Sequence, residues 1–200
     1  MFLFLDVSSP IPEFHIIADK KIVNSTRIID CSTKKLSDRL IPAYLELDKN
    51  YKISQNVKKL IVTTGPGSYT ALRVGASFIA GLSQSINLPV SQISNEVMYR
   101  KFFNCSNKIG LYFESSNNQK FFSYKKNSLF VNIKIEKEKF DLPNFISIVF
   151  YNNSVPNFLN QKVKLEKFSI KDMVIKNLQY LQFDKDLIKP IYISNNSILN

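Results

Sequence analysis

Residues Leu60–Leu82 have the sequence LIVTTGPGSYTALRVGASFIAGL, and the rest of the chain is organised around them. The short β-branched run Leu60–Thr63 predicts a buried strand. Gly65-Pro66-Gly67 then predicts a tight turn, because glycine and proline fit turn geometry and interrupt a strand. Ser68 stands where a helix N-cap belongs. The pattern therefore predicts a strand, a turn and a helix over Thr70–Gln84.

The predicted helix is apolar nearly all round. Between Ala71 and Leu82 only Arg73 and Ser77 interrupt the apolar and small residues. A helix of this kind cannot face water on either side. One face can pack on the sheet that the preceding strand joins. The other face needs a second cover, either the rest of the chain or another protein.

Composition indicates an ordinary globular protein. The chain has 200 residues, of which 44% are hydrophobic and 22% charged, so it can bury a full core. No apolar run approaches the ~20 residues of a membrane span. Two cysteines are too few for a disulfide framework or a thiolate metal cage. We therefore expect a cytoplasmic protein without membrane association.

The formal net charge of +11 suggests a nucleic-acid partner at first sight. Only four of the 27 basic residues are arginine, however, and arginine is the residue favoured for forked contacts to phosphate and bases. The lysines are scattered along the whole chain. This pattern favours a compositional bias over a tRNA-binding module, which is kept as a weaker hypothesis.

The first half of the chain predicts a mixed α/β layer structure. Phe2–Leu5 is a continuous apolar strand, and His15–Asp19 and Ile22–Asp30 are the next two strands of an antiparallel meander. Apolar residues at helical spacing predict a helix over Ser37–Asp48, capped by Ser37 or Ser32, although Pro42 inside it is expected to bend it or delay its start.

The second half is predicted to consist mainly of short strands. The polar stretch around Asn104–Asn107 is the expected boundary, which divides the chain into two α/β parts, 1–105 and 106–200. No sequence repeat relates the two parts. Helices are predicted over Asn95–Phe103 and Met173–Phe183, and a short extended end over Pro190–Ile193. Further strands are predicted over Leu88–Val90 with Ile93, Ile109–Phe113, Phe121–Tyr124, Leu129–Ile135 and Ile146–Tyr151.

Few residues suit an autonomous catalyst. Gly65–Ser68 could cradle a phosphate at a helix N-terminus, but no Gly-Lys-Ser/Thr follows, so a plain strand–turn–helix junction is equally compatible. Asp6 and Ser8 follow a buried strand; Asp6 could hold a metal ion, but it is expected to cap its own turn. His15 is the only histidine, which excludes a histidine-based metal site.

Thr64–Gly75 (TGPGSYTALRVG) resembles the GPGSFTGLRIG motif of the TsaB family, bacterial proteins of the tRNA N6-threonylcarbamoyladenosine (t6A) pathway, also called YeaZ-like. Phe4–Ser8 and Arg39–Pro42 resemble the opening strand and the first helix of that family, which carries a proline at the same place. Pro190–Ile193 resembles its closing element. Glu114–Ser116 stands where the family has Asp-Ala-Arg.

The resemblance implies an actin-like (ASKHA, ribonuclease H-like) fold with two mixed-sheet subdomains and a non-catalytic role. Family members bind the catalytic paralogue TsaD through their first two helices, and the ATPase TsaE joins that assembly. TsaD transfers the threonylcarbamoyl group to adenosine 37 of tRNA, so tRNA would be contacted only through the complex. A homodimer in the absence of TsaD, and a nucleotide at the partner interface, are compatible with the resemblance; no cofactor of its own and no metal are expected.

The partner surface is expected on the helices over Ser37–Asp48 and Thr70–Gln84. Glycine and alanine there allow close helix–helix approach, and larger apolar side chains would supply the binding energy. The residues predicted for this interface are Leu36, Leu40, Tyr44, Leu72, Gly75, Ala76, Phe78, Ile79 and Ala80. The residues predicted for a phosphate or nucleotide contact are Asp6, Ser8, Gly65, Gly67, Ser68 and Arg73.

The alternative is an ATP-dependent phosphotransferase or ATPase of the same fold. It would use Asp6 and the Gly65–Ser68 turn, together with a second phosphate loop in the C-terminal half. Gly110 is the only glycine after Gly81, so that second loop has no candidate in the sequence. The scaffold hypothesis is therefore preferred.

Overall fold

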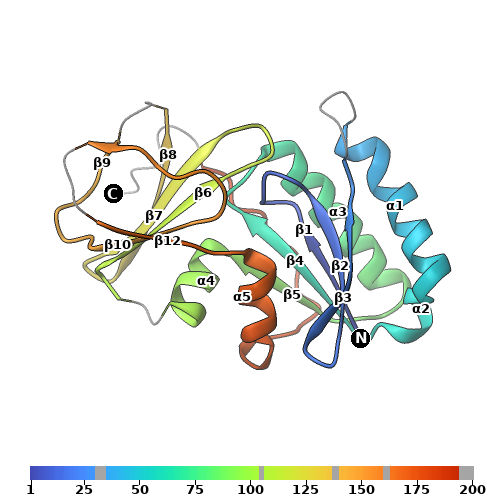
Figure 1. Ribbon diagram of the computed structural model, residues 1–200. Coiled ribbons are helices and arrows are strands. Elements are labelled where there is room, and N and C mark those ends of the chain that lie inside the picture. Colours follow the sequence, from blue (N-terminus) through green and yellow to red (C-terminus); the bar gives the residue numbers. More distant parts are fainter. Residues whose placement is uncertain (30–34, 104–105, 137–139, 160–162, 194–200) are drawn as a thin grey trace.

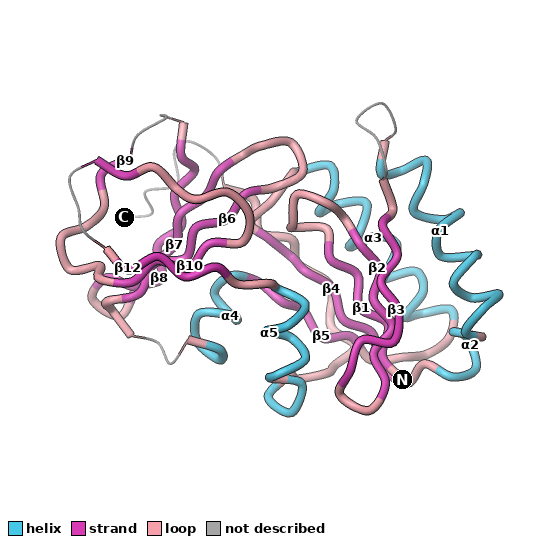
Figure 2. The backbone as a smooth tube through the Cα atoms, in the orientation of Figure 1, coloured by secondary structure: helices cyan, strands magenta, loops and turns pink. Residues whose placement is uncertain are grey.

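Two five-stranded mixed sheets, with helices beside and between them, make up the computed structural model (Figures 1 and 2). It describes residues 1–29, 35–103, 106–136, 140–159 and 163–193. This α/β architecture confirms the fold class predicted from the sequence. Within the described residues, none of the helices is long and apolar enough to cross a membrane.

The first sheet has the strand order β3-β2-β1-β4-β5. β1 to β3 form the predicted antiparallel meander, and β1, β4 and β5 run parallel to one another. The strands of this sheet are β1 (Phe2–Asp6), β2 (Glu13–Ala18), β3 (Lys21–Arg27), β4 (Lys59–Gly65) and β5 (Val90–Ser94).

Alternation along β1 sends side chains into two different cores. Leu3 and Leu5 point to one face of the sheet and Phe4 points to the other, because successive strand residues face opposite sides. All three are completely buried. A central strand that is apolar on both faces requires a helical layer on each side.

The outer face of the first sheet is covered by α1 (Leu36–Tyr51) and α3 (Tyr69–Ser85), and the short α2 (Ile53–Asn56) follows at the end of α1. α1 begins before the predicted start and contains Pro42, whose ring lies on the exposed side. The predicted cap of α1 is wrong, since Lys35 holds that position, whereas the N-cap position predicted for Ser68 is confirmed. Ser37 lies inside α1 and donates to Asp38, while Ser68 occupies the N-cap position of α3 without a side-chain hydrogen bond. Ser32 lies outside the described residues.

The inner face is covered by α4 (Asn95–Phe102) and α5 (Ile170–Lys176), which lie between the two sheets in Figure 1. The hydroxyl of Ser94 accepts a hydrogen bond from the Val97 N–H and so caps α4. One apolar cluster contains side chains from both sheets and both helices. The two halves of the chain therefore share a core.

The second sheet repeats the plan of the first. Its order, β12-β10-β6-β7-β8, again joins a three-stranded meander to two parallel strands. Its outer face is covered by loops and by the two-stranded pair β9–β11 in place of long helices. The strands are β6 (Ile109–Glu114), β7 (Lys120–Lys126), β8 (Leu129–Ile135), β9 (Phe140–Asp141), β10 (Ile148–Tyr151), β11 (Phe158–Leu159) and β12 (Lys164–Lys167).

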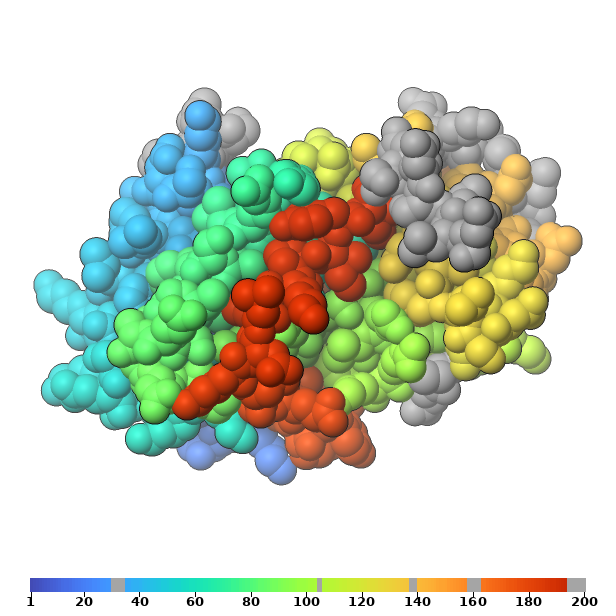
Figure 3. Space-filling view, turned by 180° about the vertical axis from the view of Figure 1, so that it is seen from behind, coloured from blue at the N-terminus to red at the C-terminus, as the bar shows by residue number. Residues whose placement is uncertain are grey.

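The last part of the chain differs from its prediction. The helix predicted over Met173–Phe183 is shorter, because α5 ends at Lys176 and a 3₁₀ turn, η1 (Leu178–Tyr180), follows. The chain then returns to the first sheet: Val90 and Asp184 exchange backbone hydrogen bonds of 2.7 and 3.1 Å, and the Ile191 N–H donates to the Thr64 carbonyl at 2.7 Å. We call residues 184–193 the C-terminal strap. It lies beside α3 in Figure 3.

Two glycines of α3 have opposite surroundings, which predicts opposite effects of the same substitution. A Cβ at Gly75 would lie 2.9 Å from both methyl groups of the buried Val7, whereas a Cβ at Gly81 would meet nothing within 4 Å. Gly75→Ala should lower the free energy of unfolding by roughly 1–2 kcal/mol, since overpacking exceeds the gain in helix propensity. Gly81→Ala should raise it by about 0.5–1 kcal/mol. Urea unfolding of both variants tests this; equal shifts would contradict the packing at Val7.

Candidate partner-binding groove

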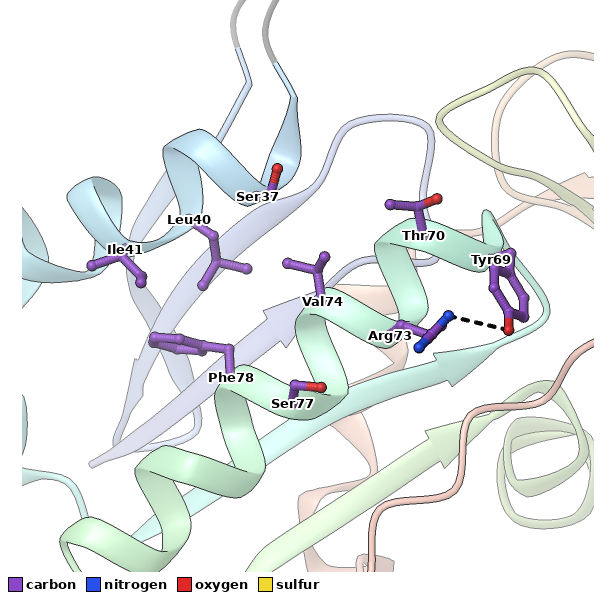
Figure 4. Close-up of a pocket in the computed structure, with 9 residues that line it drawn as sticks. All are labelled: Ser37, Leu40, Ile41, Tyr69, Thr70, Arg73, Val74, Ser77 and Phe78. Atoms are coloured by element: carbon purple, nitrogen blue, oxygen red, sulfur yellow. Dashed lines mark hydrogen bonds between the residues drawn. The ribbon is translucent and has the colours of Figure 1, made fainter.

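A groove of about 570 Å³ runs between α1 and α3 on the outer side of the first sheet (Figure 4). We call it the α1/α3 groove. Val74 and Phe78 point from α3 toward Leu40 and Ile41 of α1, so the space between the two helices is mainly apolar. The residues that line it are Ser37, Leu40, Ile41, Tyr69, Thr70, Arg73, Val74, Ser77 and Phe78.

The walls of the groove are firmly supported by aromatic packing beneath them. The Phe78 ring lies edge-on to Tyr44, with 5.2 Å between centroids, and edge-on to Phe14, with 5.8 Å between centroids. Such pairs stabilise beyond the area they bury. On the outward side of α1, Ile41 is 55% exposed and Leu45 is 58% exposed. The groove thus combines a fixed floor with uncovered apolar side chains.

One end of the groove is polar. A guanidinium N–H of Arg73 donates to the Tyr69 hydroxyl at 3.3 Å, and the guanidinium carbon lies 5.2 Å from the centre of the same ring. The other neighbour of Tyr69 is Tyr192 of the C-terminal strap, with ring centroids 4.5 Å apart. Arg73 is the single charged residue of the lining.

Most residues predicted for the partner interface are buried in the chain itself. Tyr44, Phe78 and Ala80 are partly exposed, and Leu40 forms the floor of the groove. Gly75 and Ala76 are both buried, and Gly75 packs on Val7. A lysine there would disrupt the fold rather than a contact with a partner. The predicted residues that lie in the core are Leu36, Leu40, Leu72, Gly75, Ala76 and Ile79.

Three apolar or aromatic residues of the groove lining, and the exposed Leu45 next to the groove, are absent from the predicted interface although the sequence contains a signal for them. Ile41 and Leu45 widen the apolar stripe of α1 beyond what one buried face requires. Val74 and Tyr69 belong to the apolar circumference of α3. To predict which side of each helix is exposed, one must know how the helix is oriented on the sheet. Sequence periodicity does not give this orientation when the helix is apolar on more than one side.

Asp6 caps its own turn, as expected. Its Oδ1 accepts from the backbone N–H groups of Ser8 and Ser9 at 3.0 and 3.2 Å and from the Thr63 hydroxyl at 3.0 Å. Its Oδ2 accepts from the Ser9 hydroxyl. Burial raises the pKa of the Asp6 carboxyl, although these hydrogen bonds oppose that rise. The carboxylate joins β1 to β4.

The glycine turn also packs against the chain. Gly65 has φ +114°, and a Cβ there would lie 2.8 Å from the Ile191 carbonyl oxygen, so the strap requires glycine at this position. A Cβ at Gly67 would lie 3.3 Å from the Cα of Ser8. Arg73 does not join Asp6 at this place: it lines the α1/α3 groove, whereas Asp6 lines a separate hollow. The predicted phosphate residues therefore form no single site.

That separate hollow, of about 250 Å³, lies between the two halves of the chain. Glu13 lies 3.6 Å from Arg27 and 3.7 Å from Lys171, so its carboxylate already pairs with the cations there. Asn152 and Asn153 approach from the second sheet. Across the described ranges, no group of three His, Cys, Asp or Glu side chains is placed to hold a metal ion.

Glu114 has a structural role at the end of β6. It is buried and accepts hydrogen bonds from the Asn153 side chain at 3.0 Å and from the Ser154 N–H at 3.2 Å. Burial raises the pKa of this carboxyl, but the hydrogen bonds from Ser154 and Asn153 outweigh it and leave the pKa below its ordinary value. The carboxylate thus fixes the loop after β10.

Comparison with known proteins identifies the family. A family model described as TsaD, tRNA N6-adenosine threonylcarbamoyltransferase, matches residues 30–138, just over half of the chain. The chain belongs to the TsaD family. The match spans α1, α3 and the whole β6–β7–β8 meander of the second sheet, so it includes both helices of the α1/α3 groove.

Individual relatives show that the chain is TsaB/YeaZ-like. It is 35% identical over 63 residues to the tRNA threonylcarbamoyladenosine biosynthesis protein TsaB of Bacillus subtilis (strain 168); this segment covers 31% of the chain and only 28% of that relative. A crystal structure described as an uncharacterised protein with similarity to peptidase YeaZ, from Pseudomonas aeruginosa, has a TM-score of 0.59, 13% identity, and coverage of 96% of this chain and 99% of the other.

A second structure, YeaZ from Pseudomonas aeruginosa, gives a TM-score of 0.56 at 13% identity and covers 95% of this chain and 99% of that one. At these identities the structural similarity establishes the fold alone. It confirms the actin-like architecture that the sequence resemblance implied.

His15 provides a pH-dependent measure of the junction between the two halves. Its Nδ1 lies 2.8 Å from the Ser25 hydroxyl oxygen, and the side chain is 1% exposed. Burial, and then the positive charge of Lys171, lower the pKa of His15 from 6.5 to about 4. Between pH 6.5 and pH 4 the imidazole is therefore protonated in the unfolded chain but neutral in the folded chain. The free energy of unfolding should fall by about 3 kcal/mol as pH drops through this range.

Chemical denaturation of the wild type and of His15→Gln across this pH range tests the prediction, since the variant should lose that slope. NMR gives a second measurement, because the only imidazole of the chain should not titrate between pH 7 and 5. An imidazole that titrates near pH 6.5 would contradict the burial of His15.

Proposed function

We propose that the chain is a non-catalytic subunit of the t6A synthesis machinery, one that binds a TsaD-type catalytic subunit through the α1/α3 groove. The observation that carries the proposal is the groove itself, an uncovered apolar surface on the two long helices of a TsaD-family chain. The name of the Bacillus subtilis relative supports the assignment to the t6A pathway.

The shape of the groove suits a protein partner. On α3 the lining extends from Tyr69 to Phe78, which is roughly 13 Å along a helix axis. Ile41 and Leu45 continue the apolar surface along α1. Contiguous exposed apolar surface on a soluble protein marks an interaction site, and a few central side chains usually carry most of the binding energy.

The positions that an ATPase of this fold would use are already engaged. Both oxygens of Asp6 accept hydrogen bonds from the chain, and Gly65 and Gly67 pack against Ile191 and Ser8. These contacts favour a structural turn over a phosphate cradle. The alternative of a phosphotransferase or ATPase thus has no support from this geometry.

The wider assembly follows from the proposal. A TsaE-type ATPase would join the complex of this chain with the TsaD-type subunit, and tRNA would be reached through the complex. A homodimer in the absence of the partner, and a nucleotide at the partner interface, stay predictions.

Ile41→Glu should weaken binding to the TsaD-type subunit about 30-fold or more, a loss of roughly 2 kcal/mol, because a charge would be buried in an apolar contact. Leu129→Glu is the matched control. Leu129 is 68% exposed and lies on β8 of the second sheet, far from the groove in the fold. Isothermal titration calorimetry with both variants tests the site. Equal affinity of Ile41→Glu and wild type would remove the groove from the interface.

Depletion of the protein in its own cells should lower t6A in total tRNA. Mass spectrometry of nucleosides from digested tRNA measures this directly, and re-expression of the wild-type chain should restore the level. The Ile41→Glu variant should fail to restore it, while Leu129→Glu should succeed. Unchanged t6A after depletion would overturn the assignment to the pathway.

A further inference from the structure

We infer that the polar end of the α1/α3 groove recognises a carboxylate on the docked partner segment through Arg73, and that Tyr192 of the C-terminal strap positions this arginine. The inference rests on the proposed function and specifies the chemistry of the partner. It also assigns a role to the Pro190–Ile193 segment, which does not itself line the groove.

The charge of Arg73 is not neutralised within the described part of the chain. Ion pairs there join other side chains, and the guanidinium instead contacts the hydroxyl and the ring of Tyr69. None of the nine lining residues is acidic. An arginine beside an apolar surface that becomes buried must gain a counter-charge, since burying an unpaired charge is strongly unfavourable.

Arg73 is held in place before any partner arrives. One N–H donates to the Tyr69 hydroxyl, which leaves the other guanidinium donors free for the forked, two-bond contact that arginine makes with carboxylates. The ring of Tyr69 in turn packs against the ring of Tyr192, with 4.5 Å between the two centroids. Preorganisation of this kind raises affinity because less side-chain freedom is lost on binding.

Tyr192 is itself fixed by the strap. The neighbouring Ile191 N–H donates to Thr64 at the end of β4, and the Gln92 side chain bonds to the strap backbone at Leu187 and Lys189, at 3.2 and 2.8 Å. The ring therefore reaches Tyr69 from a segment anchored on the first sheet. Tyr192 is a positioning residue, acting on Arg73 through Tyr69.

These contacts specify the partner segment. It presents apolar side chains to Val74, Phe78 and Ile41, and a carboxylate to Arg73. Arg73 and Phe78 are five residues apart, roughly 7–8 Å along α3. A helix docked along the groove would therefore carry Asp or Glu about five positions from its main apolar anchor.

Other occupants fit these observations less well. A nucleic acid would need several cations, whereas the groove offers one within an apolar lining. A second copy docked groove to groove would bring another Arg73 and no acidic lining residue. A protein segment with a carboxylate satisfies both the apolar surface and the charge.

The test measures the affinity of the full chain for the TsaD-type subunit at about 50 mM and about 300 mM salt, since a partly exposed ion pair weakens on screening. Arg73→Glu should bind at least tenfold more weakly than wild type at low salt, and this difference should narrow at high salt. Arg73→Lys should recover part of the loss, because lysine keeps the charge but lacks the fork.

Tyr192→Ala tests the positioning role. It should weaken binding about three- to tenfold at low salt and reduce the dependence of affinity on salt, with an unchanged circular dichroism spectrum. Tyr180→Ala is the matched control, because Tyr180 is 56% exposed, lies on η1 and is not among the nine residues that line the groove. It should bind like wild type.

The outcomes separate this inference from the proposed function. If Ile41→Glu fails to bind while Arg73→Glu binds like wild type at both salt concentrations, carboxylate recognition is wrong and the groove still holds the partner. If Ile41→Glu also binds normally, the proposed interface is wrong. If light scattering shows that Arg73→Glu alters only the self-association of the chain, the occupant is a second copy and the inference is overturned.

Discussion

The parallel pairing of β1 with β4 is the constraint on which the rest of the structure depends. Both strands are apolar on both faces, and the hydrogen-bonded register sets Leu3 beside Leu60 and Phe4 beside Ile61. Each face must then be covered. The outer face is covered by α1 and α3, whereas the inner face is covered by α4, α5 and the second sheet. The hydrogen bond from Thr63 to Asp6 joins the two strands at their carboxyl ends.

The α1/α3 groove results from the way α1 and α3 pack on the sheet and on each other. α3 buries one side on the sheet, where Gly75 allows it to approach Val7, and a second side partly against α1. On its third side Val74 and Phe78 point toward α1 and stay half-buried. Some apolar side chains of α3 thus pack in the core of the chain, and others line the exposed groove.

The sequence patterns predict the helices, strands and turns better than they predict which side chains are buried or exposed. β1, β4, α3 and the turn at Asp6 follow from local periodicity and turn chemistry, and each was found close to its expected place. The site was predicted less well. Gly75 and Ile41 both lie on apolar helices, but only the packing of those helices on the sheet decides that the first is buried and the second exposed. Arg73 was grouped with Asp6 by proximity to the glycine turn, whereas α3 carries it to another surface.

The C-terminal strap completes the packing of the first sheet with residues from far along the chain. Asp184 pairs with Val90, Ile188 enters the outer core, and Ile191 closes over the glycine turn. Roughly a hundred residues separate these contacts, so the entropy of closing the loop must be overcome before they form. On the ribosome, the first half of the chain would therefore wait with the edge of β5 and the glycine turn uncovered until the strap emerges. The first sheet and the cover of its glycine turn thus form in the order of synthesis, with a delay set by the length of chain between them.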